Sequence, residues 1–194
     1  MNFLAHVYLS GDDFEVALGN LIADRVKGIQ IEHYPLKIQK GIKLHRSIDH
    51  FTDSHPLFRA SVSELFPEYR HYSRVIIDLY FDHFLAANWE AHHPQNLQQF
   101  SLEFYQNIQA YAVDLPDPIN HFLGALVKYK WFEYYQTVEG LKVIMTQMDK
   151  RTRFDSNLAG SATQLVEKYS YFQSQFLKFM PQVISYSKQK LAQL

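Results

Sequence analysis

The segment from Val75 to Trp89 constrains the fold most, because it is apolar on nearly every face and still carries two carboxylates. Its polar residues are Asp78, Asp82, His83 and Asn88. This pattern is typical of a helix that is buried almost all round. Carboxylates are costly to bury without a cation, a network of hydrogen-bond donors or a metal ion. The sequence therefore predicts a polar site inside the core.

Two further segments carry polar pairs with the same four-residue spacing as Asp78 and Asp82. One pair is Asn20 and Asp24, and the other is His45 and Asp49. Each pair shares one face if its segment is a helix. Three such helices can direct their polar side chains to one divalent cation inside a helical domain. A buried ion-pair network is the alternative, with its positive charge supplied by Arg46, Arg70 or Arg74.

Apolar residues at helical spacing recur along the chain and predict an all-α fold. One helix is expected to run through Asp24, and another follows Pro35 and ends near the His55-Pro56 step. No segment shows sustained alternation of polar and apolar residues with hairpin turns. At 194 residues the chain is long enough to bury one large core. We therefore expect a single compact multi-helix domain over residues 1–194.

Charge and composition exclude several classes of protein. The 19 basic and 20 acidic residues give a formal net charge of -1, so no overall basic signal points to nucleic acid or an anionic membrane. Without cysteine the chain has no disulfide, thiolate nucleophile or cysteine-bound zinc. No apolar run reaches the roughly 18 residues of a membrane span, and the first residues lack the basic region of a signal peptide. We expect a cytoplasmic protein, and the sequence does not indicate its oligomeric state.

The residue types in these pairs favour one kind of metal chemistry. Carboxylates mixed with imidazole suit Mn²⁺ or Mg²⁺, with Fe²⁺ as a further alternative. Such a site would support attack of metal-activated water on a phosphate ester. Arg46 could bind a phosphate oxygen, or it could pair with Asp49 or Asp53. His6 is expected to be a hydrogen-bonded core histidine, with a catalytic role as the alternative.

Four blocks of sequence stand in order along the chain: MNFLAHVYLSG at the start, GNLIADRVKG at 19–28, GIKLHRSIDHFTDSHP at 41–56 and RHYSRVIIDLYFDHFLAANW at 70–89. Together they resemble the acyl carrier protein phosphodiesterases, densely over residues 1 to about 90 and loosely beyond. The resemblance implies an all-α fold related to the HD-type phosphohydrolases, and a Mn²⁺-dependent enzyme. The implied reaction removes 4'-phosphopantetheine from holo acyl carrier protein and leaves the apo form.

The resemblance also implies a set of site residues. Six residues would hold or surround the metal, namely Asp24, His45, Asp49, Asp78, Asp82 and His83. Arg46 and Arg70 would be the phosphate-binding candidates.

A substrate as acidic as a carrier protein predicts a basic docking surface. Lys150, Arg151 and Arg153 are the first candidates, with a plain solvated patch as the alternative. Arg25 and Lys27 are the second. Two other functions remain open from the sequence. The chain could hydrolyse another phosphate ester, such as a nucleotide, or it could be a non-catalytic helical binding protein.

Overall fold

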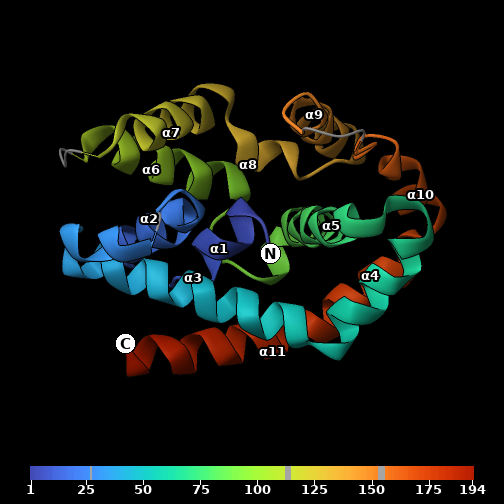
Figure 1. Ribbon diagram of the computed structural model, residues 1–194, viewed down its shortest axis with the longest axis horizontal. Helices are drawn as coiled ribbons and strands as arrows, with labels where there is room; N and C mark the ends of the chain where they lie inside the picture. The colour runs from blue at the N-terminus through green and yellow to red at the C-terminus, as the bar shows by residue number, and fades with distance from the viewer. Residues whose placement is uncertain (27, 112–114, 153–155) are drawn as a thin grey trace.

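The computed structural model describes residues 1–26, 28–111, 115–152 and 156–194. Over these residues the chain is helical and contains no strand, which confirms the predicted all-α fold (Figure 1). The first half comprises α1 (Phe3–Tyr8), α2 (Phe14–Ile22), α3 (Leu36–Ser54), α4 (Pro56–Tyr69) and α5 (Ser73–Ala87), with 3₁₀ turns η1 (Ala23–Arg25), η2 (Gly28–His33), η3 (Arg70–Tyr72) and η4 (Trp89–Ala91). The second half comprises α6 (Leu97–Ala110), α7 (Asp117–Tyr129), α8 (Trp131–Tyr134), α9 (Val138–Asp149), α10 (Ser161–Glu167) and α11 (Tyr169–Gln193).

Helix α5 lies in the core, as its apolar composition predicts. The Phe81 ring packs against Phe58 of α4 and against Phe176 and Phe179 of α11. All four rings are buried, and each such side chain contributes about 1.5–3 kcal/mol to folding. Asp82 follows Phe81 and is completely buried. The predicted polar group inside the core is therefore present.

Helices α2 and α3 touch through their backbones at two glycines. A Cβ atom on Gly41 would lie 2.1 Å from the carbonyl oxygen of Val16, and a Cβ atom on Gly19 would lie 2.2 Å from a carbonyl oxygen of α3. Only glycine allows helix backbones to approach this closely. Asn20 follows Gly19, and His45 lies one turn after Gly41. The glycine crossing therefore brings the two predicted polar pairs to the same place.

Helix α2 ends at Ile22, earlier than expected, so Asp24 lies in η1 and not on the same helix as Asn20. The reason is the Asn20 carbonyl, which accepts from the Ala23 N–H and lies 2.8 Å from His45 Nδ1. The Asn20 carbonyl therefore bonds to the N–H three residues later and not to the one four residues later, and the chain continues as a 3₁₀ turn. This turn carries Asp24 round toward α3.

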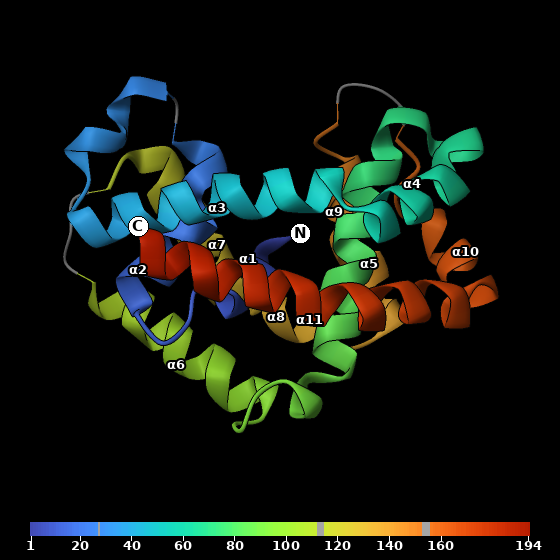
Figure 2. The same cartoon turned by 90° about the horizontal axis from the view of Figure 1, so that it is seen from below.

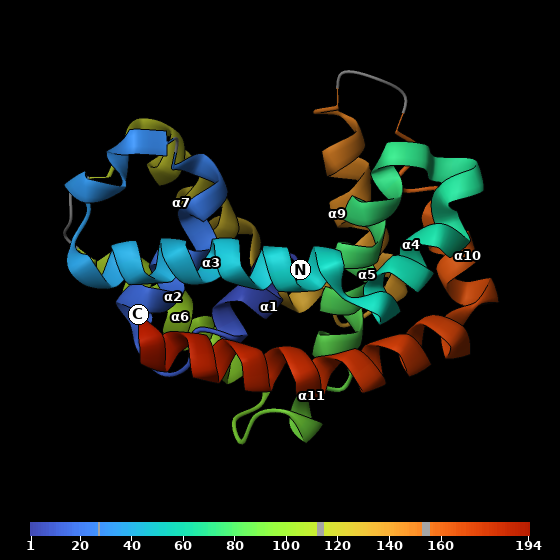
Figure 3. The same cartoon turned by 60° about the horizontal axis from the view of Figure 1, so that its bottom comes forward.

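Helices α3 and α11 run side by side in opposite directions and form one wall of the molecule (Figure 2). The Phe51 and Tyr186 rings stack across this contact with centroids 4.4 Å apart. Helix α1 lies near the middle of the molecule, and Met1 is buried (Figure 3). Among the described residues, no helix combines the length and the hydrophobicity needed to cross a bilayer.

Candidate metal centre

Three side chains from α1 and α3 converge into a cluster that could hold a metal ion. His6 lies on α1, and His45 and Asp49 lie one turn apart on α3; one ligand atom of each lies within 4.8 Å of the others. Asp49 Oδ2 is 3.0 Å from His45 Nε2, and Asp49 Oδ1 is 3.2 Å from His6 Nε2. Both imidazoles are buried, while Asp49 is partly open to solvent. We call His6, His45, Asp49 and the neighbouring Asp24 the metal cluster.

Asp24 lies at the outer edge of the metal cluster. Its Oδ1 atom is 3.1 Å from His45 Nε2, and its side chain is 70% exposed. The hydrogen bond from His45 lowers the pKa of Asp24, so the carboxylate is charged at neutral pH. The predicted pair of His45 and Asp49 is thus joined by a second carboxylate, Asp24 of η1, at the same ring nitrogen of His45.

Asn20 orients His45 from the other side of the ring. His45 Nδ1 is 2.8 Å from the backbone oxygen of Asn20 and 3.1 Å from its Oδ1 atom. The Asn20 amide donates to the His6 carbonyl and to Ser10 Oγ, each at 2.9 Å. An acceptor at Nδ1 holds the hydrogen there and leaves Nε2 facing the carboxylates, as in histidines that bind metals. Asn20 was predicted only as the partner of Asp24, and its contacts could not be read from spacing.

The electrostatics of the metal cluster suit a cation. Burial and the neighbouring His45 lower the pKa of His6 to about 4, so this ring is neutral at neutral pH. Burial alone would lower the pKa of His45, but Asp24 and Asp49 raise it to about 9. Burial would raise the pKa of Asp49, yet His45 and His6 bring it below its usual range. The shared proton on His45 Nε2 thus occupies the position that a divalent cation would take.

His6 supplies the clearest sign that the residues fit a metal ion. Both of its ring nitrogens are buried, and neither has an aligned hydrogen-bond partner among the described residues. The 3.2 Å approach of Nε2 to Asp49 lacks hydrogen-bond geometry. An unpaired buried polar group costs about 1–3 kcal/mol. A cation held between His6 and Asp49 would remove this cost. The expected core hydrogen bond of His6 is therefore absent in this part of the structure.

Asp78 and Asp82 bind the start of the chain. Asp78 Oδ1 lies 2.6 Å from the Met1 ammonium. Asp82 accepts from the N–H groups of Asn2, Leu4 and Ala5 at 3.0, 2.8 and 3.3 Å. These are the free donors at the first turn of α1, where a carboxylate is favoured.

The two acids on α5 thus hold α1, and with it His6, in place. Burial raises the pKa of Asp82 to about 7, although the ammonium and the backbone donors act in the opposite direction. Neither acid belongs to the group of ligand atoms found within 4.8 Å of one another. This differs from the predicted ligand role, because the donors that satisfy the acids come from the backbone of α1 and from Met1. No pattern of side chains in the sequence reveals such donors.

His83 faces away from the metal cluster. Its Nδ1 atom is 2.8 Å from the Tyr135 carbonyl oxygen, and its Nε2 atom is 3.1 Å from the Tyr169 hydroxyl. Adjacent helical residues point about 100° apart. Because Asp82 faces α1, His83 faces α8 and α11. The structure does not bring this predicted ligand together with His45 and Asp49.

The predicted phosphate-binding arginines lie at the surface. Arg46 is exposed and pairs with no described carboxylate. Arg70 ends α4 with φ of 49°, and its guanidinium lies over the Phe66 ring. Of the docking candidates, Lys150 is exposed, and Arg151 lines a groove beside Arg25. Lys27 and Arg153 lie outside the described residues.

The chain as a whole matches one protein family. The sequence model for acyl carrier protein phosphodiesterase matches residues 1–183. This chain belongs to that family. Relatives named acyl carrier protein phosphodiesterase from Serratia proteamaculans (strain 568) and Yersinia pestis are each 30% identical over 191 residues, which is 98% of this chain and 99% of theirs. No solved structure matches the chain, so the predicted relation to HD-type phosphohydrolases stays a prediction.

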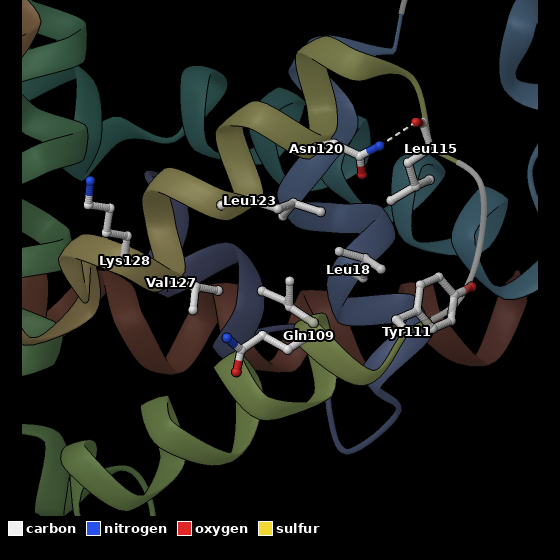
Figure 4. A pocket seen from close by; sticks show the side chains of 10 residues that line it. Leu18, Gln109, Tyr111, Leu115, Asn120, Leu123, Val127 and Lys128 are labelled. Carbon is white, nitrogen blue, oxygen red and sulfur yellow. Dashed lines mark hydrogen bonds between the residues drawn. The ribbon is translucent and has the colours of Figure 1, made fainter.

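Two hollows in this member of the phosphodiesterase family differ in their relation to the metal cluster. One has a volume of about 340 Å³ and lies between α2, α6 and α7; Asn120 donates to the Leu115 carbonyl at its rim (Figure 4). No described residue that lines it is His, Asp or Glu. The other, of about 630 Å³, is lined by Phe3 of α1 and by Arg25, the residue after Asp24. The second hollow therefore borders α1 and η1, two of the elements that carry the metal cluster.

Proposed function

We propose that this protein is a metal-dependent phosphodiesterase that hydrolyses holo acyl carrier protein to the apo form and releases 4'-phosphopantetheine. The observation that carries the proposal is the unsatisfied His6 imidazole beside Asp49 and His45. Membership of the acyl carrier protein phosphodiesterase family supplies the substrate. The chemistry of the cluster, with two imidazoles and two carboxylates, supports Mn²⁺ as the metal, with Mg²⁺ or Fe²⁺ as alternatives.

Each residue of the cluster has a part in holding the cation. His6 Nε2, His45 Nε2 and Asp49 would bind it from the buried side, and Asp24 would close the site from the solvent side. The bound metal would polarise the phosphodiester and lower the pKa of a coordinated water. Asn20 keeps the His45 ring in the orientation that directs Nε2 toward the carboxylates. Asp78 and Asp82 support His6 by holding α1.

The reaction adds one water across the bond between phosphorus and the serine oxygen of the carrier protein. The phosphopantetheine keeps the oxygen of the water, and the serine oxygen leaves with a proton. Asp24 is the most exposed carboxylate of the cluster, so it is placed to accept the proton of the attacking water. Arg46 and Arg70 as phosphate ligands, and the cytoplasmic location, stay predictions.

The test is intact-protein mass spectrometry of holo acyl carrier protein incubated with this protein and Mn²⁺, with a chelator control. We expect a Mn²⁺-dependent loss of about 340 Da, the mass of the phosphopantetheinyl group that hydrolysis by metal-activated water would remove. If protein shown to contain metal produces no loss, the substrate is another phosphodiester. If the protein produces no loss and also takes up no metal, the non-catalytic interpretation is correct.

A further inference from the structure

A groove beside the metal cluster is lined mainly by aromatic and aliphatic side chains. It has a volume of about 630 Å³ and is bounded by α1, η1, the end of α7, α8 and α9. This volume lies within the range of about 300–1,000 Å³ that is usual for small-ligand sites. We call it the aromatic groove, and its principal residues are Phe3, Arg25, Trp131, Tyr134, Val143 and Met148.

The aromatic groove is poorly covered by the protein itself. Tyr129 is 53% exposed, Tyr134 is 39% exposed and Val143 is 47% exposed. All three line the groove. Large apolar side chains that are exposed next to one another mark a binding surface more often than isolated ones do. Helix α8 connects α7 to α9 at this place, so the exposed side chains come from consecutive elements (Figure 1).

One end of the aromatic groove is lined by residues of α1 and η1, the elements that carry His6 and Asp24. Phe3 and His6 lie one turn apart on α1, and Arg25 directly follows Asp24. The Arg25 guanidinium lies 3.4 Å from the centroid of the Phe122 ring and 5.8 Å from that of Phe3. It lies within electrostatic range of both Asp24 and Arg151. A positive charge therefore lies at the end of the groove that is nearest to Asp24.

The other end of the aromatic groove is apolar. Val143 precedes Asp149, the last residue of α9, by six positions, which is about 9 Å along the helix axis. Arg151 follows the end of α9 and lies close enough to Arg25 for their charges to interact, so Val143, earlier on α9, lies toward the other end of the groove. A ligand that spans the groove would thus meet positive charge first and apolar side chains next. This order matches a phosphate group followed by an uncharged chain.

We propose that the aromatic groove binds the pantetheine arm of the substrate, with the phosphate end at Arg25 and Asp24 and the uncharged arm along Trp131 and α9. This inference rests on the proposed function, since that function supplies a phosphodiester with an arm of this kind. The aromatic rings and the aliphatic side chains of α9 would pack against the arm. Arg25 would bind a phosphate oxygen while its flat face stays against Phe122.

The chain provides its own reporter for this proposal. It contains two tryptophans: Trp131 lines the aromatic groove, whereas Trp89 is buried elsewhere and lies outside it. In ¹⁵N-labelled protein each indole N–H gives a separate NMR peak, and Trp131→Phe assigns the two. The protein is kept metal-free with a chelator so that no hydrolysis occurs. It is then titrated with holo and with apo acyl carrier protein, which differ only in the arm.

We expect holo carrier protein to shift the Trp131 peak and apo carrier protein to leave it in place, with the Trp89 peak unmoved in both titrations. Equal responses to the holo and apo forms, or no response of Trp131, would overturn the proposal. These results do not depend on turnover. If Mn²⁺ produces no cleavage and Trp131 still responds to the holo form alone, the groove binds the arm and the proposed reaction is wrong.

A matched pair of variants provides the second readout. Val143→Trp places a large ring in the aromatic groove, and Val166→Trp places the same ring on α10, where Val166 is 60% exposed. Both sites are at the surface, so both proteins should fold. We expect Val143→Trp to raise the KM for holo carrier protein about tenfold and to weaken the Trp131 response, while Val166→Trp behaves as the wild type. An unchanged KM in Val143→Trp, with wild-type cleavage intact, would overturn the arm site and leave the proposed reaction standing.

Discussion

The imidazole rings of His6 and His45 stack with their centroids 4.0 Å apart and an angle of 19° between their planes. The two rings come from α1 and α3, and Asp49 contacts both. Two stacked imidazolium cations would repel each other, so His45 adds to burial in lowering the pKa of His6 to about 4, whereas Asp24 and Asp49 raise the pKa of His45 to about 9. The pair thus offers one neutral ring and one ring whose proton can be exchanged for a metal ion.

Asp49→Asn should abolish metal binding by the cluster. Asp49 contacts both imidazoles, and a neutral amide in its place would not attract the cation. We expect the Mn²⁺-dependent rise in melting temperature to disappear. Activity on holo carrier protein should fall by at least about 100-fold. Thermal melts with and without Mn²⁺ provide the measurement. Asp53→Asn is the matched control, because Asp53 lies one turn further along α3 and pairs with Arg74 at the surface; equal losses in both variants would contradict the assignment.

Asp82→Ala should lower the free energy of unfolding, and the loss should be the same whether or not metal is bound. The change leaves the N–H groups of Asn2, Leu4 and Ala5 at the start of α1 without their acceptor, and we expect a loss of about 3 kcal/mol in the free energy of unfolding. Asp82→Asn retains an acceptor oxygen and should lose much less. Urea unfolding in chelator measures both. A metal-free Asp82→Ala protein as stable as the wild type would show that Asp82 is not structural and would favour the ligand role predicted from the sequence.

Gly41→Ala should separate α2 from α3. The new methyl group would lie 2.1 Å from the Val16 carbonyl oxygen, so the helices must move apart. We expect a loss of about 1–3 kcal/mol in stability and a weaker affinity for Mn²⁺, because Asn20 and Asp24 would shift relative to His45. Gly124→Ala on α7 is the control. Its Cβ atom would meet nothing within 4 Å, and alanine there should stabilise the helix by about 0.5–1 kcal/mol. Calorimetric titration of both variants with Mn²⁺ measures whether the affinity falls in Gly41→Ala and stays unchanged in Gly124→Ala.

The stability of the metal-free protein should fall as the pH rises above neutrality. The pKa of His45 is about 9 in the folded protein and near 6.5 when unfolded. Its contribution is therefore complete below pH 6.5 and is lost as the pH rises through 9. Because Asp24 and Asp49 are partly exposed, we expect a loss on the order of 2 kcal/mol. Urea unfolding in chelator between pH 6 and pH 10 measures it. His45→Gln should remove most of this slope, and an unchanged slope would contradict the assignment.

The same proton should oppose metal binding. A cation that binds His45 Nε2 must displace the proton held there. The affinity for Mn²⁺ should therefore increase with pH up to about 9, and binding at pH 7.5 should release about one proton. Calorimetric titrations in buffers of different ionisation enthalpy count the protons. Release of no proton would show that His45 does not bind the metal through Nε2.

The helical spacing of the sequence was sufficient to predict the all-α fold and the buried position of α5, because an amphipathic or fully apolar period is a local property. It also predicted the pairing of His45 with Asp49, which lie one turn apart on one helix. The end of α3 at the His55-Pro56 step was likewise predicted, because the residue before a proline is disfavoured in the helical conformation. Each of these features involves residues close together in the chain.

The same spacing could not distinguish between the roles of two acids, Asp49 and Asp82. Asp49 and Asp82 both belong to i,i+4 pairs on helices. Asp49 nevertheless joins the metal cluster, whereas Asp82 accepts hydrogen bonds from the backbone N–H groups at the start of α1. His6 was expected to find a hydrogen bond in the core, and instead its nitrogens have none among the described residues. These outcomes depend on where α1 lies against α3 and α5.

The sequence by itself thus determined the helices, the polar groups that they carry and the family to which the chain belongs. Only the tertiary structure decided which of those groups meet. The physical reason is that a helix sets the direction of a side chain, whereas its partner comes from whichever backbone packs opposite. Here the close crossing at Gly19 and Gly41 brings Asn20 and Asp24 to His45, and the start of the chain occupies Asp78 and Asp82.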